Sequence, residues 1–202
     1  MSKQFFDEKR PHNGKTYNEY FTEWEESLEK VNPDELDAEA KSTYEYTKMN
    51  MQRTKRIHKT YTVSDELKAM LSKITKEQIW MVLTENWCGD SAQTLPYIAL
   101  AAHENSNIKF RILNRDENLD IMDQYLTEKG ARSIPKLVAF DTEGNELFQW
   151  GPRPKEAQKL VQEEMAKGRE KQEVYKDLHL WYGRNRGQEI EKELMEILKD
   201  IA

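Results

Sequence analysis

The sequence predicts an α/β fold in which a mixed β-sheet is sandwiched by helices, with added helices at both ends of the chain. Three observations support this prediction. Residues 79–84, IWMVLT, form a continuous apolar run short enough for a strand buried on both faces. Residues 79–167 alternate extended and helical patterns in the order β-α-β-α-β-β-α. The segments before and after this unit carry apolar residues at helical spacing.

The composition favours a folded, cytoplasmic protein. With 37% hydrophobic and 10% aromatic residues among 202, the chain has enough apolar material for a core. A single cysteine excludes a disulfide within the chain. The first residues contain no apolar run of signal-peptide length, and the longest unbroken apolar stretch, residues 79–83, is too short to span a membrane. A net charge of −6 argues against nonspecific nucleic-acid binding by the whole chain.

Residues 1–61 are predicted to form an N-terminal helical extension. A first helix ends at the NPD sequence of residues 32–34, and a second runs from Asp34 toward Lys55. The basic end of the second helix could form an anion or nucleic-acid patch, but a solvated helix face is the favoured interpretation. The apolar face of the first helix consists of Tyr17, Tyr20, Phe21, Trp24, Leu28 and Val31.

Residues 62–168 are predicted to form the α/β domain. Ser64 is placed to cap a helix whose inward face precedes the first strand. A helix follows that strand, and residues 107–113 alternate as a second strand. The next helix is expected over residues 117–130, where Gly130 ends it.

The remaining elements complete the sheet and add a C-terminal extension. Residues 134–140 lead through the turn sequence DTEGNE to LFQW, a pattern typical of an antiparallel hairpin, and a helix follows over 154–167. Residues 169–202 read as two amphipathic helices with a break at 182–187. Both extensions are expected to pack on the domain, because their apolar faces would otherwise form large exposed patches.

The only cysteine, Cys88, lies just beyond the carboxyl end of the first strand and at the start of a helix. Backbone N–H groups at a helix N-terminus stabilise a thiolate and lower its pKa, whereas the neighbouring Asp90 opposes this unless it caps the helix or pairs with a cation. The direction of the net pKa shift stays open. A lone cysteine is often a small buried hydrophobe, but this position favours a reactive role. The candidate cations are Arg115, Arg132 and Lys136.

These motifs resemble the thioredoxin fold, with WCGDS at the strand-to-helix turn and RSIPKL before the third strand. More narrowly, YTKMNMQR, WCGDSAQTLP, RDENLD, IPKL, WGPRP and LWYGRNRG together resemble an uncharacterised bacterial family of thioredoxin-like proteins. The second resemblance covers nearly the whole chain. It implies a thioredoxin-like sheet sandwiched by helices.

The chain departs from thioredoxin at three positions. Thioredoxins carry two cysteines as C-x-x-C, and here Ser91 stands at the second. Val82 stands where thioredoxins keep a buried carboxylate, and Asp90 replaces the proline of the turn. Ser91 can donate a hydrogen bond to a thiolate but cannot resolve a mixed disulfide, so the second thiol must come from outside.

The resemblance also implies a set of site residues. Cys88 and Ser91 are the catalytic candidates. Pro135 resembles the cis-proline beside the thioredoxin thiol, where the preceding residue pairs with an incoming peptide. Trp87 offers a flat apolar surface to a partner, although a core aromatic is an equal alternative. The substrate-binding candidates are Trp87, Gly89, Asp90, Arg115, Ile134 and Pro135.

Two polar segments near the site have plainer interpretations. Arg115 and Asp116 could hold an anionic or peptide partner, but an ordinary ion pair is favoured. Arg153, in WGPRP, is a weaker candidate, since this sequence is typical of the exit from an edge strand. The four histidines show no ligand spacing, and we expect no metal, nucleotide or other cofactor.

Two functions are compatible with this sequence. The first is a thiol-disulfide oxidoreductase or isomerase in which Cys88 alone attacks a disulfide-containing protein or a small-molecule disulfide, and an external thiol releases it. The alternative is a non-catalytic protein-binding module on a thioredoxin-like scaffold. A peroxidase is a weaker hypothesis. No nucleic-acid or membrane partner is expected.

Overall fold

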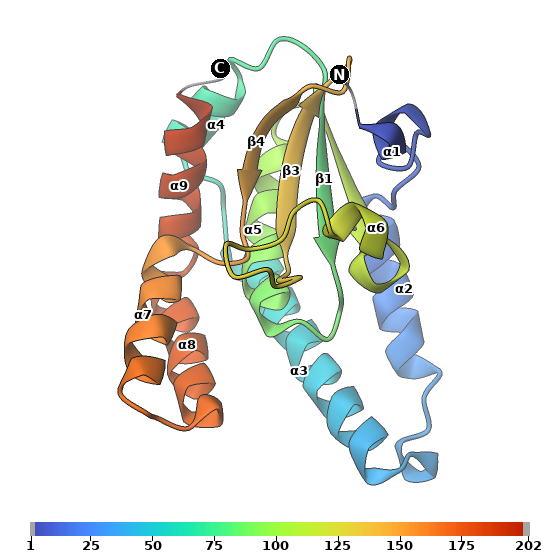
Figure 1. The fold of residues 1–202 in the computed structure, drawn as a ribbon, viewed down its shortest axis with the longest axis vertical. Helices are drawn as coiled ribbons and strands as arrows, with labels where there is room; N and C mark the ends of the chain where they lie inside the picture. The colour runs from blue at the N-terminus through green and yellow to red at the C-terminus, as the bar shows by residue number, and fades with distance from the viewer. Residues whose placement is uncertain (1–2, 200–202) are drawn as a thin grey trace.

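The computed structural model describes residues 3–199 and places a four-stranded mixed sheet at the centre of the molecule (Figure 1). The strand order is β2-β1-β3-β4. β1 runs parallel to β2 and antiparallel to β3, and β3 is antiparallel to β4. The mixed sheet and the predicted hairpin are therefore confirmed. The strands are β1 (Gln78–Thr84), β2 (Ile108–Asn114), β3 (Lys136–Asp141) and β4 (Glu146–Trp150).

Helices cover both faces of this sheet, as the sequence predicted. Alternate residues of β1 point to opposite faces, so Trp80 and Val82 join one apolar cluster while Met81 and Leu83 join another. The larger cluster receives residues from α2, α3, α4, α5 and α9, and the smaller one from α1 and α6. The helices are α1 (Gln4–Asp7), α2 (Tyr17–Glu29), α3 (Ala38–Thr60), α4 (Asp65–Leu71), α5 (Gly89–His103), α6 (Leu119–Met122), α7 (Lys155–Ala166), α8 (Lys171–Asn185) and α9 (Gln188–Leu198), with 3₁₀ turns η1 (Pro33–Glu35) and η2 (Arg115–Glu117).

The bounds of the second predicted helix were wrong at both ends. α3 begins at Ala38 rather than Asp34, because the Asp37 side chain accepts the Ala40 N–H at 2.8 Å and caps the helix there. The preceding residues form the separate turn η1. α3 then continues to Thr60.

The single helix expected over residues 117–130 was also wrong. Only η2 and the four-residue helix α6 form there, and Asn118 between them is not helical, with φ of −132°. Its side chain donates to the Asn114 carbonyl and accepts from Arg10, so tertiary contacts draw this residue out of a helix. Ser64, by contrast, caps α4 as predicted.

The break between the last two helices lies within the predicted residues 182–187 but is shorter than expected. α8 continues through Gly183 to Asn185, and the chain turns at Arg186 and Gly187, which both have positive φ. A Cβ at Gly187 would overlap the ring of Tyr97, so a glycine is required there.

The described parts of both extensions are helical and packed on the domain. α3 contacts α5 through hydrogen bonds such as that from the Arg56 guanidinium to Gln93 Oε1, at 3.2 Å. Trp24 is buried in the larger cluster, whereas Trp181 is half-buried beside the small core that α7 and α8 share. The predicted boundaries at residues 62 and 168 stay predictions, and residues 1–2 and 200–202 of the extensions lie outside the described residues.

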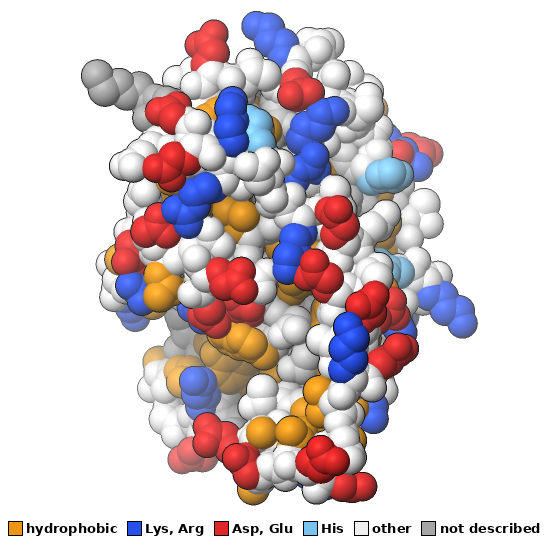
Figure 2. All heavy atoms as spheres, turned by 90° about the vertical axis from the view of Figure 1, so that its right-hand side faces the viewer, with side chains coloured by type: hydrophobic (Ala, Val, Ile, Leu, Met, Phe, Trp, Pro, Cys, Tyr) orange, Lys and Arg blue, Asp and Glu red, His pale blue; other side chains and the backbone are white. Residues whose placement is uncertain are grey.

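The surface mixes charges of both signs. Figure 2 shows acidic and basic side chains interspersed over one face, with apolar side chains gathered in its lower half. This pattern is typical of a solvated protein surface. No helix among residues 3–199 is long and apolar enough to cross a membrane.

Candidate functional site

Cys88 lies between the end of β1 and the start of α5. This junction is at the lower end of the sheet in Figure 1. Cys88 is the N-cap of α5, and its Sγ accepts the Ser91 N–H at 3.5 Å. The thiol also donates to the Ile134 carbonyl oxygen at 3.3 Å, across a cis Ile134–Pro135 peptide. Both the cis peptide and its position beside Cys88 were predicted, and both are confirmed.

Burial decides the protonation of this thiol. Cys88 is 9% exposed, and loss of solvent raises the pKa of the thiol, with a further increase from the Asp90 carboxylate. The Ser91 hydrogen bonds lower this pKa but do not reverse the shift. The effect of burial on the pKa of Cys88 therefore outweighs the effect of the helix N-terminus. At neutral pH the thiol is protonated, which agrees with its donation to Ile134.

A hydrogen bond from the end of the preceding strand holds the Ser91 side chain in place. This side chain is buried, and the Thr84 hydroxyl donates to the Ser91 Oγ at 2.7 Å. Thr84 ends β1, so the strand and the first turn of α5 are fixed to each other at the site. Ser91 thus contributes both its backbone N–H and its hydroxyl to the surroundings of the Cys88 sulfur.

Asp90 pairs with partners that the sequence analysis did not name. Arg153 donates to it through both Nε and a terminal nitrogen, and the Tyr182 hydroxyl donates to the Asp90 Oδ1 at 2.7 Å. The two side chains of the ion pair are 8% and 11% exposed. None of the three cations considered from the sequence, Arg115, Arg132 and Lys136, is this partner; Arg115 and Arg132 bind Asp116 and Asp123 instead.

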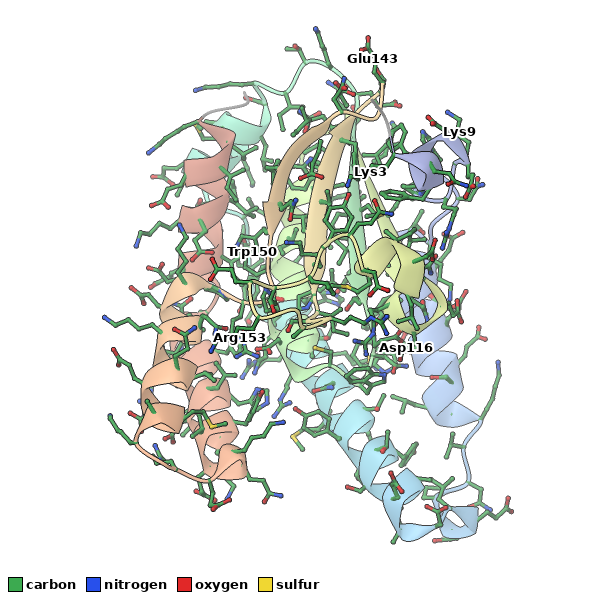
Figure 3. All side chains as sticks on the ribbon, in the orientation of Figure 1. Lys3, Lys9, Asp116, Glu143, Trp150 and Arg153 are labelled. Carbon is green, nitrogen blue, oxygen red and sulfur yellow. The ribbon has the colours of Figure 1, made fainter. Side chains whose placement is uncertain are left out.

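The ion pair joins three distant parts of the chain. Asp90 lies at the start of α5, Arg153 follows β4, and Tyr182 belongs to α8. Figure 3 places Arg153 between the lower end of the sheet and the α7–α8 pair. Burial and the Asp90 charge raise the pKa of the Tyr182 hydroxyl, so it stays a donor. From the sequence motif WGPRP, Arg153 was a weaker site candidate, and an edge-strand exit was the favoured interpretation.

The exposed Trp87 and the half-buried Arg115 lie against each other. Trp87 is 38% exposed, which excludes the core-aromatic alternative, and the Arg115 guanidinium lies 5.2 Å from the centre of its ring. Arg115 Nε donates to Asp116 Oδ1 at 2.7 Å, so the ion-pair interpretation is confirmed. Asp116 lies at the same end of the sheet as Arg153, toward α6 (Figure 3).

The sequence analysis missed a carboxylate three residues before Cys88. Glu85 is buried, and burial raises the pKa of its carboxyl, although the group accepts the Asp116 N–H at 2.8 Å. Its position in ENWC was the available signal. Val82, by contrast, belongs to the larger apolar cluster, on the other face of the sheet from the cluster that contains Cys88.

A pocket of about 330 Å³ opens beside Cys88, and α8 forms one of its walls. Gly89 lies so close to Tyr46 and His179 that a Cβ there would come within 2.9 Å of the His179 ring and still nearer to the Tyr46 hydroxyl. Burial, with the charges of Arg53 and Arg153, lowers the pKa of His179 to about 4. The pocket is lined by Tyr46, Trp87, Cys88, Gly89, Asp90, Lys171, Tyr175 and His179.

Sequence reasoning found only half of this pocket. Trp87, Cys88, Gly89 and Asp90 were candidates, whereas the other lining residues come from α3 and α8 and were not. Among residues 3–199, no group of three or more His, Cys, Asp or Glu side chains could hold a metal ion.

Comparisons with known proteins agree with this geometry. A family model described as thioredoxin matches residues 37–167. A crystallised HIV epitope-scaffold aligns with a TM-score of 0.57 and 16% identity, covering 95% of this chain and 96% of the other. A protein of unknown function from Pseudomonas aeruginosa aligns with a TM-score of 0.53 and 17% identity, over 84% and 90% of the two chains. These two structures show the fold alone, and no curated protein matches the sequence significantly.

Proposed function

This chain belongs to the thioredoxin family, and from that premise we propose that it exchanges thiols and disulfides through Cys88 alone. The observation that carries the proposal is the placement of Cys88. Its sulfur caps α5, contacts the Ile134 carbonyl and borders a surface pocket, so one small opening movement would expose it to a disulfide. Ser91 leaves the chain without a resolving thiol.

The proposed reaction needs two external sulfur compounds. Cys88 loses its proton to solvent, and the thiolate attacks one sulfur of a disulfide RSSR; a bond forms between Sγ and that sulfur, and RS⁻ leaves. A second thiol, R′SH, then attacks the mixed disulfide as its thiolate and releases Cys88. The balance is R′SH plus RSSR giving RSH plus RSSR′. We propose the cytoplasm as its compartment, since the reaction requires a supply of reduced thiol.

The raised pKa of Cys88 sets the expected pH dependence. Since only the thiolate attacks, the rate increases with pH through neutrality and continues to rise above the ordinary thiol range. A neutral probe, bis(2-hydroxyethyl) disulfide, suits this test, with adduct formation followed by mass spectrometry between pH 6 and pH 10.

The expected result is a single adduct that added thiol removes and that Cys88→Ser abolishes. Native protein that stays unmodified up to pH 10, while the unfolded protein reacts, would exclude the exchange reaction.

A non-catalytic protein-binding module is the second candidate. The observation that favours it is that Cys88 is buried and protonated, next to an Asp90 side chain that is held in an ion pair with Arg153. An unreactive native thiol together with a binding surface that includes the exposed Trp87 would support this alternative.

A further inference from the structure

The pocket beside Cys88 has aromatic walls that carry cations. Arg53 lies 5.6 Å from the ring centre of Tyr46, and Lys171 lies 5.6 Å from that of Tyr175. Arg153 also lies 5.9 Å from the centre of the Tyr175 ring. Such stacking on an aromatic ring holds a cation at a defined place and leaves its charge available to an anionic ligand.

Two of these cations have no carboxylate partner. Arg153 is neutralised by Asp90, which is the one acidic residue that lines the pocket. Arg53 donates to Asn50, a neutral side chain, and within residues 3–199 neither Arg53 nor Lys171 forms an ion pair. Two cations that no carboxylate neutralises therefore lie at the pocket, Lys171 in its lining and Arg53 against the ring of Tyr46, although the whole chain has a net charge of −6.

A second observation also indicates a positive site. His179 lines the pocket, and burial, with a smaller contribution from the charges of Arg53 and Arg153, lowers the pKa of its ring to about 4. The two guanidinium charges thus act on a side chain inside the pocket. His179 adds polar atoms there without adding charge.

We propose that this pocket binds small disulfides that carry carboxylates, with Arg53 and Lys171 attracting the anionic groups and Cys88 exchanging with the sulfur. This inference rests on the proposed exchange reaction and names its substrate class. The volume of about 330 Å³ is at the lower end of the range for small-molecule sites, and the walls from α3 and α8 leave room for a compact ligand.

Three disulfides of similar size and different charge test the proposal. They are 3,3′-dithiodipropionate, which is anionic, bis(2-hydroxyethyl) disulfide, which is neutral, and cystamine, which is cationic. The rate of adduct formation at Cys88 is measured for each with the native protein at pH 8.5. Each rate is divided by the rate of the same compound with the unfolded protein, which removes the intrinsic reactivity of the compound.

The anionic compound should give the highest normalised rate and the cationic one the lowest, with a difference that shrinks when salt is added. Arg53→Gln and Lys171→Gln should each lower the ratio of the anionic to the neutral rate by roughly two- to fivefold. Lys171→Arg keeps the charge and should keep the ratio. Lys76→Gln removes an exposed lysine beyond the opposite end of β1 and is the matched control.

The outcomes separate the two proposals. If the native protein forms no adduct with any of the three compounds, the exchange reaction itself is wrong. If the neutral compound reacts but the anionic one has no advantage, or if the Arg53 and Lys171 variants behave like Lys76→Gln, the exchange stands and the anionic ligand class is wrong.

Discussion

Replacing Asp90 with Asn tests the buried ion pair that joins the Cys88 helix to α8. The change removes the charge that Arg153 faces while keeping the size of the side chain. Arg153 is only 11% exposed, so its guanidinium would stay buried without a counter-charge. The Tyr182 hydroxyl would keep an acceptor but lose a charged one.

The expected loss of stability is large. Breaking a buried pair by removing one partner costs about 3–5 kcal/mol. For a chain of this size, each kcal/mol lowers the melting temperature by about 2–4 °C, so the variant should melt roughly 6–20 °C below the wild type. The measurement is thermal unfolding at pH 7 followed by circular dichroism.

Asp123→Asn is the matched control. Asp123 pairs with Arg132 at 2.6 Å, but those two side chains are 45% and 44% exposed, and such a surface pair contributes little to stability. If Asp90→Asn melts no lower than Asp123→Asn, the ion pair does not hold the site together. Adding Arg153→Met to Asp90→Asn should recover part of the loss, because it removes the uncompensated charge.

The same variant should also make Cys88 more acidic. Asp90 is the second cause of the raised thiol pKa, after burial, so its neutralisation should move the alkylation of Cys88 to lower pH. Tyr182→Phe is the control, since it loosens the same contact but keeps the carboxylate. An equal displacement of the pH profile in both variants would attribute the effect to exposure rather than charge.

Three further predictions concern the site, its fold and its pH dependence. The Ser91→Cys variant should form an internal disulfide with Cys88 under mild oxidant, because the two residues are one helical turn apart. If mass spectrometry shows that both thiols of this variant remain free, the prediction is wrong. A fragment limited to residues 62–168 should be less stable and less soluble than the whole chain, since it lacks α2, α3 and α9, and equal melting temperatures would show the extensions to be dispensable. His179 has a folded pKa of about 4 against an unfolded value of 6.5, so its contribution to the free energy of unfolding is complete above pH 6.5 and is lost as the pH falls through 4. In urea unfolding between pH 7 and pH 4, the wild type should therefore lose up to about 2 kcal/mol more stability than His179→Gln. Equal losses of stability in the two proteins would refute the assignment.

The sequence alone was enough to predict the sheet and the place of the thiol. Period-two alternation and a short apolar run mark strands whatever their surroundings, because the pleat puts alternate side chains on opposite faces. The order of elements then put Cys88 at the carboxyl end of β1. The strands and the position of Cys88 follow from local patterns, whereas the place of Ile134 beside the thiol followed from the resemblance of IPKL to the cis-proline segment of thioredoxin.

Tertiary structure alone decided the chemistry of the site. The pKa of Cys88 depends on how much solvent the packed chain removes, and the partners of Asp90 come from Arg153 and Tyr182, 63 and 92 residues away. The basic end of α3 looked like a solvated face, yet folding places Arg53 against the ring of Tyr46, which lines the pocket. Burial and long-range charge pairing have no local sequence period, so only the folded chain brings these groups together.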